Sequence, residues 1–73
     1  MRVDKVQTSR NLRVLMAARH ADVASLASAL NVSRTTVYNY LKAKRSPDPE
    51  RSELICRLLG VQMTDLIAYR PEA

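Results

Sequence analysis

Apolar side chains recur along the chain at the three- and four-residue spacing that is typical of short amphipathic helices. In the first part of the chain, this spacing predicts a helix that runs to about Arg19. Its start has two interpretations. Thr8 or the serine after it can cap the helix, which leaves residues 1–8 as a basic N-terminal arm. Alternatively, Asp4 stands at capping-box spacing from a glutamine and begins the helix earlier.

The later helices are predicted by residues that favour helix ends. Asp22, Ser33 and Asp48 are N-cap residues, and Pro49 fits the first position of a helix, where a missing N–H costs nothing. Gly60 is a typical helix end. The predicted helices are about 23–30, 34–42, 49–59 and 64–68. No alternating segment is long enough to predict a strand, so we expect an all-α bundle of about five short helices.

The stretch from Val23 to Leu41 predicts a pair of short helices joined by a tight turn. Ala27 is small where two crossing helices must approach closely. Helices of about eight residues are not stable alone, so they must pack on each other and on the first and fourth helices. The residues that fill the space between them are Leu30, Val32, Val37 and Tyr40. This geometry is a helix-turn-helix, whose second helix can enter a major groove.

Composition narrows the function. Lys and Arg outnumber Asp and Glu by 12 to 7, a net charge of +5, and a small, basic, helical domain favours nucleic-acid binding. Cys56 and His20 are the only residues of their kinds, which excludes an intrachain disulfide and a zinc site of known spacing. No catalytic pattern is present, so we expect no enzyme activity, no metal and no cofactor. Arg51, Arg57 and Arg70 are expected to be plain surface charges.

The order of these features resembles the phage-repressor-like (Cro/C1-type, XRE-like) helix-turn-helix superfamily over roughly Ser9 to Ile67. The residues that carry the resemblance are Leu26-Ala27, Leu30-Asn31-Val32-Ser33, Val37, Tyr40, Ala43 to Pro47, Leu59-Gly60-Val61 and Leu66-Ile67. The resemblance implies a lambda-repressor-like fold with the DNA-binding motif at helices two and three. The family often has glycine where this chain has Asn31 and Ala43. Met16 and Leu41 stand where members commonly hold a buried ion pair, and we expect these two side chains to touch.

The resemblance also implies which residues face DNA. Arginine suits guanine, asparagine suits adenine and a threonine methyl suits thymine, so the chemistry agrees independently. The candidate base-contacting residues are Arg34, Thr35, Tyr38 and Asn39. The candidate phosphate-contacting residues are Ser33, Lys42, Lys44, Arg45 and Arg10. Arg2 and Lys5 are candidates for a DNA-contacting arm.

One short recognition helix reads only a few base pairs, so we expect a homodimer with half-sites about 34 Å apart. The resemblance implies an interface in the last helix and the loop before it. The candidate interface residues are Leu58, Met63, Leu66, Ile67 and Tyr69. The alternative to an interface role for Leu66 and Ile67 is that their side chains complete the hydrophobic core of the same domain.

The sequence therefore predicts a sequence-specific, double-stranded DNA-binding transcriptional regulator, a small homodimeric repressor of a palindromic operator. The alternatives are an antitoxin or other protein-interaction module on the same fold, and a controller that both activates and represses. Residues 9–69 form the predicted domain and 70–73 a short tail. We expect a cytoplasmic protein of bacterial, phage or plasmid origin that is associated with the nucleoid, with no membrane segment and no small-molecule ligand.

Overall fold

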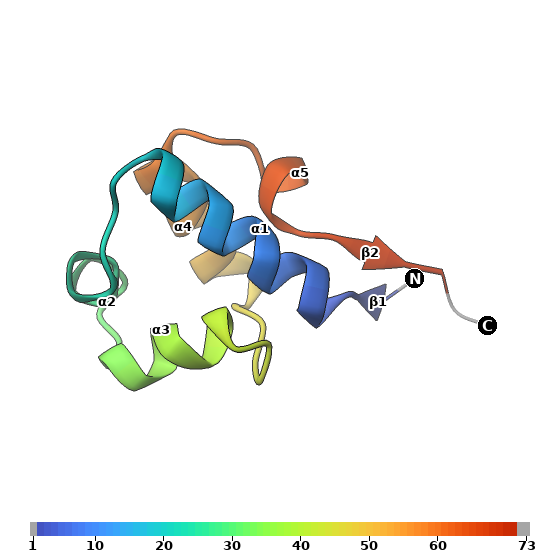
Figure 1. The fold of residues 1–73 in the computed structure, drawn as a ribbon, viewed down its shortest axis with the longest axis horizontal. Helices are drawn as coiled ribbons and strands as arrows, with labels where there is room; N and C mark the ends of the chain where they lie inside the picture. The colour runs from blue at the N-terminus through green and yellow to red at the C-terminus, as the bar shows by residue number, and fades with distance from the viewer. Residues whose placement is uncertain (1, 72–73) are drawn as a thin grey trace.

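The computed structural model describes residues 2–71, which form five helices and a short two-stranded sheet. The all-α bundle predicted from the sequence is confirmed, with one small sheet added to it. Figure 1 shows α1 running through the middle of the molecule, with the other helices packed around it and the paired chain ends extending to one side. The elements are β1 (Arg2–Val3), α1 (Lys5–Ala18), α2 (Val23–Leu30), α3 (Arg34–Leu41), α4 (Pro49–Leu59), α5 (Met63–Leu66) and β2 (Tyr69–Arg70).

Side-chain caps set the starts of the four longer helices. Asp22 and Asp48 each accept a hydrogen bond from the backbone N–H three residues later, at 2.7 and 2.8 Å. Ser33 Oγ accepts from the N–H of Thr36 at 3.1 Å. These caps satisfy N–H groups that have no partner inside the helix, and they confirm the three predicted N-caps.

The first helix begins at the earlier of its two predicted starts. Asp4 is the N-cap, and its Oδ1 accepts from the N–H of Gln7 at 3.0 Å. Thr8 lies inside the helix and is buried. The idea of a free arm over residues 1–8 is therefore wrong for its described part, because residues 2–3 are β1 and residues 5–8 are helical.

The four longer helices all end in the same left-handed closure, although the chain has one glycine. In each, the N–H of the residue after the left-handed position bonds to the carbonyl five residues earlier, which satisfies carbonyl groups at the helix end. The left-handed residues are His20, Asn31, Ala43 and Gly60, with φ of 54°, 57°, 62° and 69°. The closing bonds are Ala21–Met16 at 2.9 Å, Val32–Ala27 at 3.0 Å, Lys44–Asn39 at 3.0 Å and Val61–Cys56 at 2.9 Å.

One continuous core lies between the helices, and it contains the residues that the helical spacing selects. Val37, Ile55 and Leu66 are fully buried, and Cys56 is buried on the apolar face of α4. Met16 is buried in this core, and Leu41 packs against its edge. The buried cluster consists of Leu12, Met16, Leu26, Ala27, Leu30, Val37, Tyr40, Ile55, Cys56, Leu59 and Leu66.

The two ends of the chain are joined, which the sequence did not predict. β1 and β2 pair antiparallel, with Arg2 opposite Arg70 and Val3 opposite Tyr69. Beside this pair, three hydrogen bonds connect the start of the chain to the segment after α5. They run from Asp4 N–H to Ala68 O at 2.8 Å, from Ala68 N–H to Thr8 Oγ1 at 3.1 Å, and from Asn11 Nδ2 to Leu66 O at 3.1 Å. Met1, Glu72 and Ala73, which end the predicted arm and tail, lie outside the described residues.

Candidate nucleic-acid interface

The second helix of the helix-turn-helix, α3, has a buried side and an exposed side. α2 and α3 pack closely, and Val37 and Tyr40 of α3 are buried in the core. The turn between the helices contains left-handed Asn31 and the cap Ser33. The exposed side of α3 is thereby held by both the core and the turn.

The residues predicted to read bases lie along the outer side of α3. Arg34, Thr35 and Tyr38 are exposed, and Asn39 is half-buried. Arg34 and Thr35 are in the first turn, so the end of the helix that carries free N–H groups also carries these side chains. The four side chains offer an arginine fork, a hydroxyl, a phenol and an amide on one short helix.

Tyr38 and Lys42 interact one turn apart. The Lys42 ammonium lies 6.0 Å from the centre of the Tyr38 ring, at the outer limit of a cation–π contact. Tyr38 is nonetheless 47% exposed. The phenol and the ammonium therefore stand together at the last turn of α3, where a cation also suits the helix dipole.

The basic loop after α3 is fixed at both ends by its backbone. The carbonyl oxygen of Asn39 accepts from the N–H groups of Lys44 and Arg45, at 3.0 and 3.2 Å. At the other end, the buried Ser52 hydroxyl donates to Pro47 O at 3.2 Å. Lys44 and Arg45 are exposed, so an anchored backbone presents two cations at the surface.

Sequence reasoning missed the residues that anchor this loop and the chain ends. Ser52 stands at helical spacing from Ile55, Cys56 and Leu59, and Thr8 stands at the same spacing from Leu12. A hydroxyl on an otherwise apolar stripe indicates a buried hydrogen bond, because an unpaired buried polar group costs free energy. That signal points to both residues.

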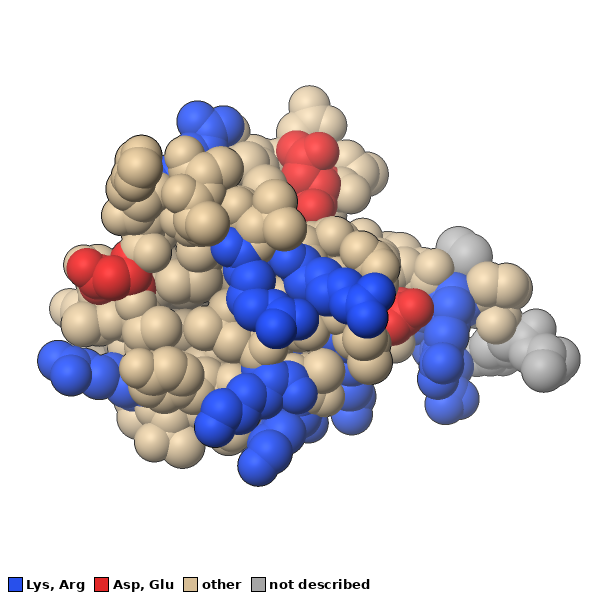
Figure 2. All heavy atoms as spheres, in the orientation of Figure 1, with Lys and Arg blue, Asp and Glu red and all other residues tan. Residues whose placement is uncertain are grey.

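The remaining predicted phosphate contacts lie on separate elements. Ser33 is exposed, and its Oγ is 3.0 Å from the Oγ1 of Thr36 as well as capping α3. Arg10 is exposed on α1, which packs against α3. Figure 2 shows basic side chains gathered over the middle and lower part of the face where α1 and α3 lie, with sparse acidic groups.

Acidic residues are mostly engaged in capping helices or in ion pairs on α4. The pKa of Asp22 is lowered, first by the Ser25 N–H bond and in smaller part by Arg34. The pKa of Asp48 is lowered mainly by the N–H of Arg51. The ion pairs among residues 2–71 are Arg51–Asp48 at 2.8 Å and Arg57–Glu53 at 2.6 Å. Neither involves α3 or residues 42–45, so the cations there are available to an external anion.

The predicted interface residues fall into three places. Met63, Ile67 and Tyr69 together line a cavity of about 290 Å³. Leu58 lines a different one of about 170 Å³, between α2 and α4. Leu66 is 0% exposed, because its side chain completes the core of the domain. It has no surface to offer to a second copy, and the alternative interpretation of Leu66 as a core residue is correct.

Residues 2–71 lack two features that would point to other functions. No helix there is long and apolar enough to cross a membrane. In the same span, no group of three or more His, Cys, Asp or Glu side chains is arranged to hold a metal ion.

Comparisons with known proteins agree with this geometry. A solved transcriptional regulator from Listeria innocua is similar over 100% of this chain, with a TM-score of 0.79 and 22% identity. The chain spans 65% of that structure's length, and the low identity shows a shared fold alone. A search of curated proteins found no match. The family model of the Cro/C1-type helix-turn-helix DNA-binding domain matches residues 11–72, and the chain belongs to this family.

Proposed function

We propose that this chain is a sequence-specific regulator of transcription that inserts α3 into the major groove of double-stranded DNA. The observation that carries the proposal is the outer side of α3, where exposed Arg34, Thr35 and Tyr38 stand beside Asn39. Arginine pairs bidentately with O6 and N7 of guanine, and asparagine pairs with N6 and N7 of adenine. These four residues are the proposed base readers.

Phosphate contacts would fix the position of α3 without reading sequence. The anchored loop supports this role for Lys44 and Arg45, because its backbone bonds to Asn39 hold both cations beside the end of α3. Ser33 and the free N–H groups at the start of α3 suit a further phosphate. The full proposed set is Ser33, Lys42, Lys44, Arg45 and Arg10.

A homodimer would give such a small reader sufficient specificity, because two copies double the length of DNA that is read. Met63 and Tyr69 are 38% and 58% exposed, and with Ile67 they form a connected apolar surface. We assign the interface to these three residues. Leu58 and Leu66 are left out, since one lines a separate cavity and the other is buried.

A symmetric dimer matches a palindromic operator, and a protein that occupies such a site can block transcription from it. The exposed positions of α2 are Ala24, Ser25, Ser28 and Ala29. They offer no acidic surface for contact with polymerase, which favours blocking over direct activation.

Selection from a pool of random duplexes at physiological salt tests DNA reading and symmetry together. We expect enrichment of an inverted repeat whose half-site centres lie about one helical turn, roughly 34 Å, apart. A single half-site would retain the reader and overturn the dimer. Binding that is sensitive to salt but enriches no sequence would overturn sequence reading and favour a protein partner for this fold.

Sedimentation equilibrium of Met63→Glu tests the interface. A charge in the centre of an apolar contact should convert dimer to monomer. Leu58→Glu is the matched control, because it places the same charge at an exposed leucine outside the proposed interface. The assignment would be contradicted if Met63→Glu remained a dimer. It would also be contradicted if Leu58→Glu became a monomer while Met63→Glu did not.

A further inference from the structure

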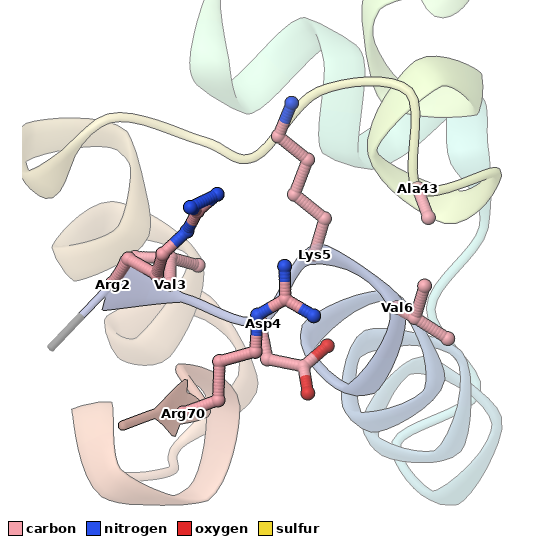
Figure 3. A pocket seen from close by; sticks show the side chains of 7 residues that line it. All are labelled: Arg2, Val3, Asp4, Lys5, Val6, Ala43 and Arg70. Atoms are coloured by element: carbon pink, nitrogen blue, oxygen red, sulfur yellow. The ribbon is translucent and has the colours of Figure 1, made fainter. Parts of the chain in front are cut away.

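A basic cleft lies where the two chain ends meet. It is a cavity of about 310 Å³, and Figure 3 shows its lining side chains. They are Arg2 and Val3 of β1, Asp4, Lys5 and Val6 at the start of α1, Ala43 after α3, and Arg70 of β2. We propose that this terminal cleft holds a phosphate of the DNA backbone outside the segment that α3 contacts. The inference rests on the proposed function and extends its contact surface.

The cross-strand pairing in the cleft points to an anion. Arg2 and Arg70 are direct partners in the β1–β2 pair. Like charges placed opposite each other on neighbouring strands destabilise the pairing. The pairing of the strands themselves is made by backbone bonds, which do not depend on the two arginine side chains. A bound phosphate would turn this repulsion into a pair of charge-assisted hydrogen bonds.

A third cation joins them from a different element. Lys5 lies at the start of α1, and in Figure 3 its side chain extends toward the loop after α3. Within residues 2–71, none of Arg2, Lys5 and Arg70 has an ion-pair partner. Three cations from three elements thus line one cavity.

The cleft has one carboxylate, that of Asp4, against three cations. Asp4 Oδ1 accepts from the N–H of Gln7 at 3.0 Å and caps α1. In Figure 3 the carboxylate points away from the end of Lys5 and is drawn on the side of the Arg70 guanidinium, although the ion pairs among residues 2–71 do not include these two groups. The cleft therefore keeps an excess of positive charge even with Asp4 ionised.

The location of the cleft favours DNA over a free anion. Ala43 lines it, and the next two residues are Lys44 and Arg45 of the basic loop. The cleft therefore adjoins the phosphate-contacting residues of the proposed function. A DNA strand that contacts Lys44 and Arg45 would therefore pass next to the cleft that Arg2 and Arg70 line.

The inference is tested by measuring the affinity of Arg70→Gln for two duplexes that carry the same operator but differ in length. The first duplex carries the selected operator with long flanks, and the second is trimmed to the half-sites. We expect Arg70→Gln to weaken binding of the long duplex about three- to tenfold. Its salt slope should become shallower by about 0.9 for each phosphate that the variant no longer neutralises. Binding of the trimmed duplex should equal that of the wild type.

Two further variants control this experiment. Arg57→Gln removes the same charge from an exposed residue of α4 that is paired with Glu53, and it should affect neither duplex in this length-dependent way. Lys5→Gln should repeat the weakening seen with Arg70→Gln on the long duplex. The thermal midpoint of Arg70→Gln should equal or exceed that of the wild type, because the substitution removes a like-charge pair.

The outcomes separate the inference from the function on which it rests. If Arg70→Gln and Lys5→Gln bind both duplexes with wild-type affinity, the phosphate-binding role of the cleft is overturned, while DNA reading by α3 is unaffected. Equal weakening on long and trimmed duplexes would also overturn it. If inorganic phosphate alone raises the wild-type thermal midpoint and duplex length has no effect, the ligand is a free anion and the DNA assignment fails. Failure of the wild type to select any sequence would instead overturn the proposed function.

Discussion

The backbone N–H of Lys44 donates to the carbonyl oxygen of Asn39 at 3.0 Å, so the end of α3 and the start of the basic loop form one rigid unit. Ala43 makes this closure possible by adopting a left-handed φ of 62°. Such a conformation is costly for alanine, by roughly 1–2 kcal/mol, because its Cβ approaches the following carbonyl. The geometry of the proposed DNA-contacting surface thus depends on a strained residue.

Replacement of Ala43 by glycine should relieve that strain. We expect Ala43→Gly to raise the free energy of unfolding by about 0.5–1 kcal/mol, after the greater flexibility of the unfolded chain offsets part of the gain. Urea unfolding measures this free energy of unfolding. Ala29→Gly, at an exposed helical position, should lower the same quantity by about 1 kcal/mol. A decrease in stability in both variants would show that Ala43 is not strained.

The salt dependence of DNA binding should report the basic loop. We expect Lys44→Ala to weaken binding to specific and random duplexes alike and to flatten the salt slope by about 0.9 for each phosphate left without its cation. Arg57→Ala, which removes a cation paired with Glu53 on α4, should leave the slope unchanged. Unequal weakening on specific and random DNA for Lys44→Ala would mean that this residue reads bases.

Acid should destabilise the fold through its capping carboxylates. The pKa of Asp48 is below its usual value, mainly because the N–H of Arg51 bonds to the ionised form. Such a group stabilises the fold above its unfolded pKa, about 3.9, and this stabilisation is lost as the pH falls through the lower folded pKa. We therefore expect thermal stability to fall below about pH 4.

The variant Asp48→Asn distinguishes the effect of the capping hydrogen bond from the effect of protonating the Asp48 carboxylate. Asparagine is itself a good N-cap, so the variant should fold, and its stability should decline less steeply in acid. Glu50→Gln removes a neighbouring carboxylate that is not an N-cap and should keep the wild-type decline. Identical acid profiles for Asp48→Asn and the wild type would refute the assignment.

The hydrogen bond between the Thr8 hydroxyl and the Ala68 N–H should stabilise the contact between the two chain ends. Thr8→Val keeps the shape of a buried side chain but removes the acceptor for the Ala68 N–H. We expect a decrease of about 1–2 kcal/mol in the free energy of unfolding, and faster hydrogen exchange at Ala68. Thr64→Val, at an exposed position of α5, should stay within about 0.5 kcal/mol of the wild type. Unchanged exchange at Ala68 would contradict this account.

Local signals were sufficient to predict most of the fold. Asp22, Asp48, Asn31 and Gly60 cap helix ends in the structure because capping depends on bonds within a few residues. The predicted last helix, near 64–68, instead begins at Met63 and ends at Leu66. Helix ends without a strong breaker are set by packing, and here the side chain of Leu66 anchors the helix in the core.

Contacts between distant residues could not be predicted in this way. β1 and β2 are two residues each, too short to show an alternating pattern, and their pairing joins Val3 to Tyr69. The sequence alone therefore predicts only a surface charge at Arg70, whereas the pairing places it beside Arg2. Apolar spacing also cannot tell a core residue from an interface residue, which is why the sequence groups Leu66 with Met63.

The candidate site was predictable from helical spacing because α3 is a regular helix with an obvious buried side. Val37 and Tyr40 fix that side, and Arg34 and Thr35 then have to lie outside. The half-buried state of Asn39 and the anchoring of the loop by Ser52 required the structure.

Parallel DNA selections with the wild type and Arg34→Ala test most directly whether α3 reads sequence. Arg34 is exposed at the first position of α3, so its removal should leave the fold intact. We predict that Arg34→Ala loses the base preference at one position of each half-site, at a cost of about 1–3 kcal/mol in binding, and keeps the others. Lys44→Ala, selected beside it, should enrich the wild-type sequence. If Arg34→Ala enriches the wild-type sequence with every base preference intact, the central claim is contradicted.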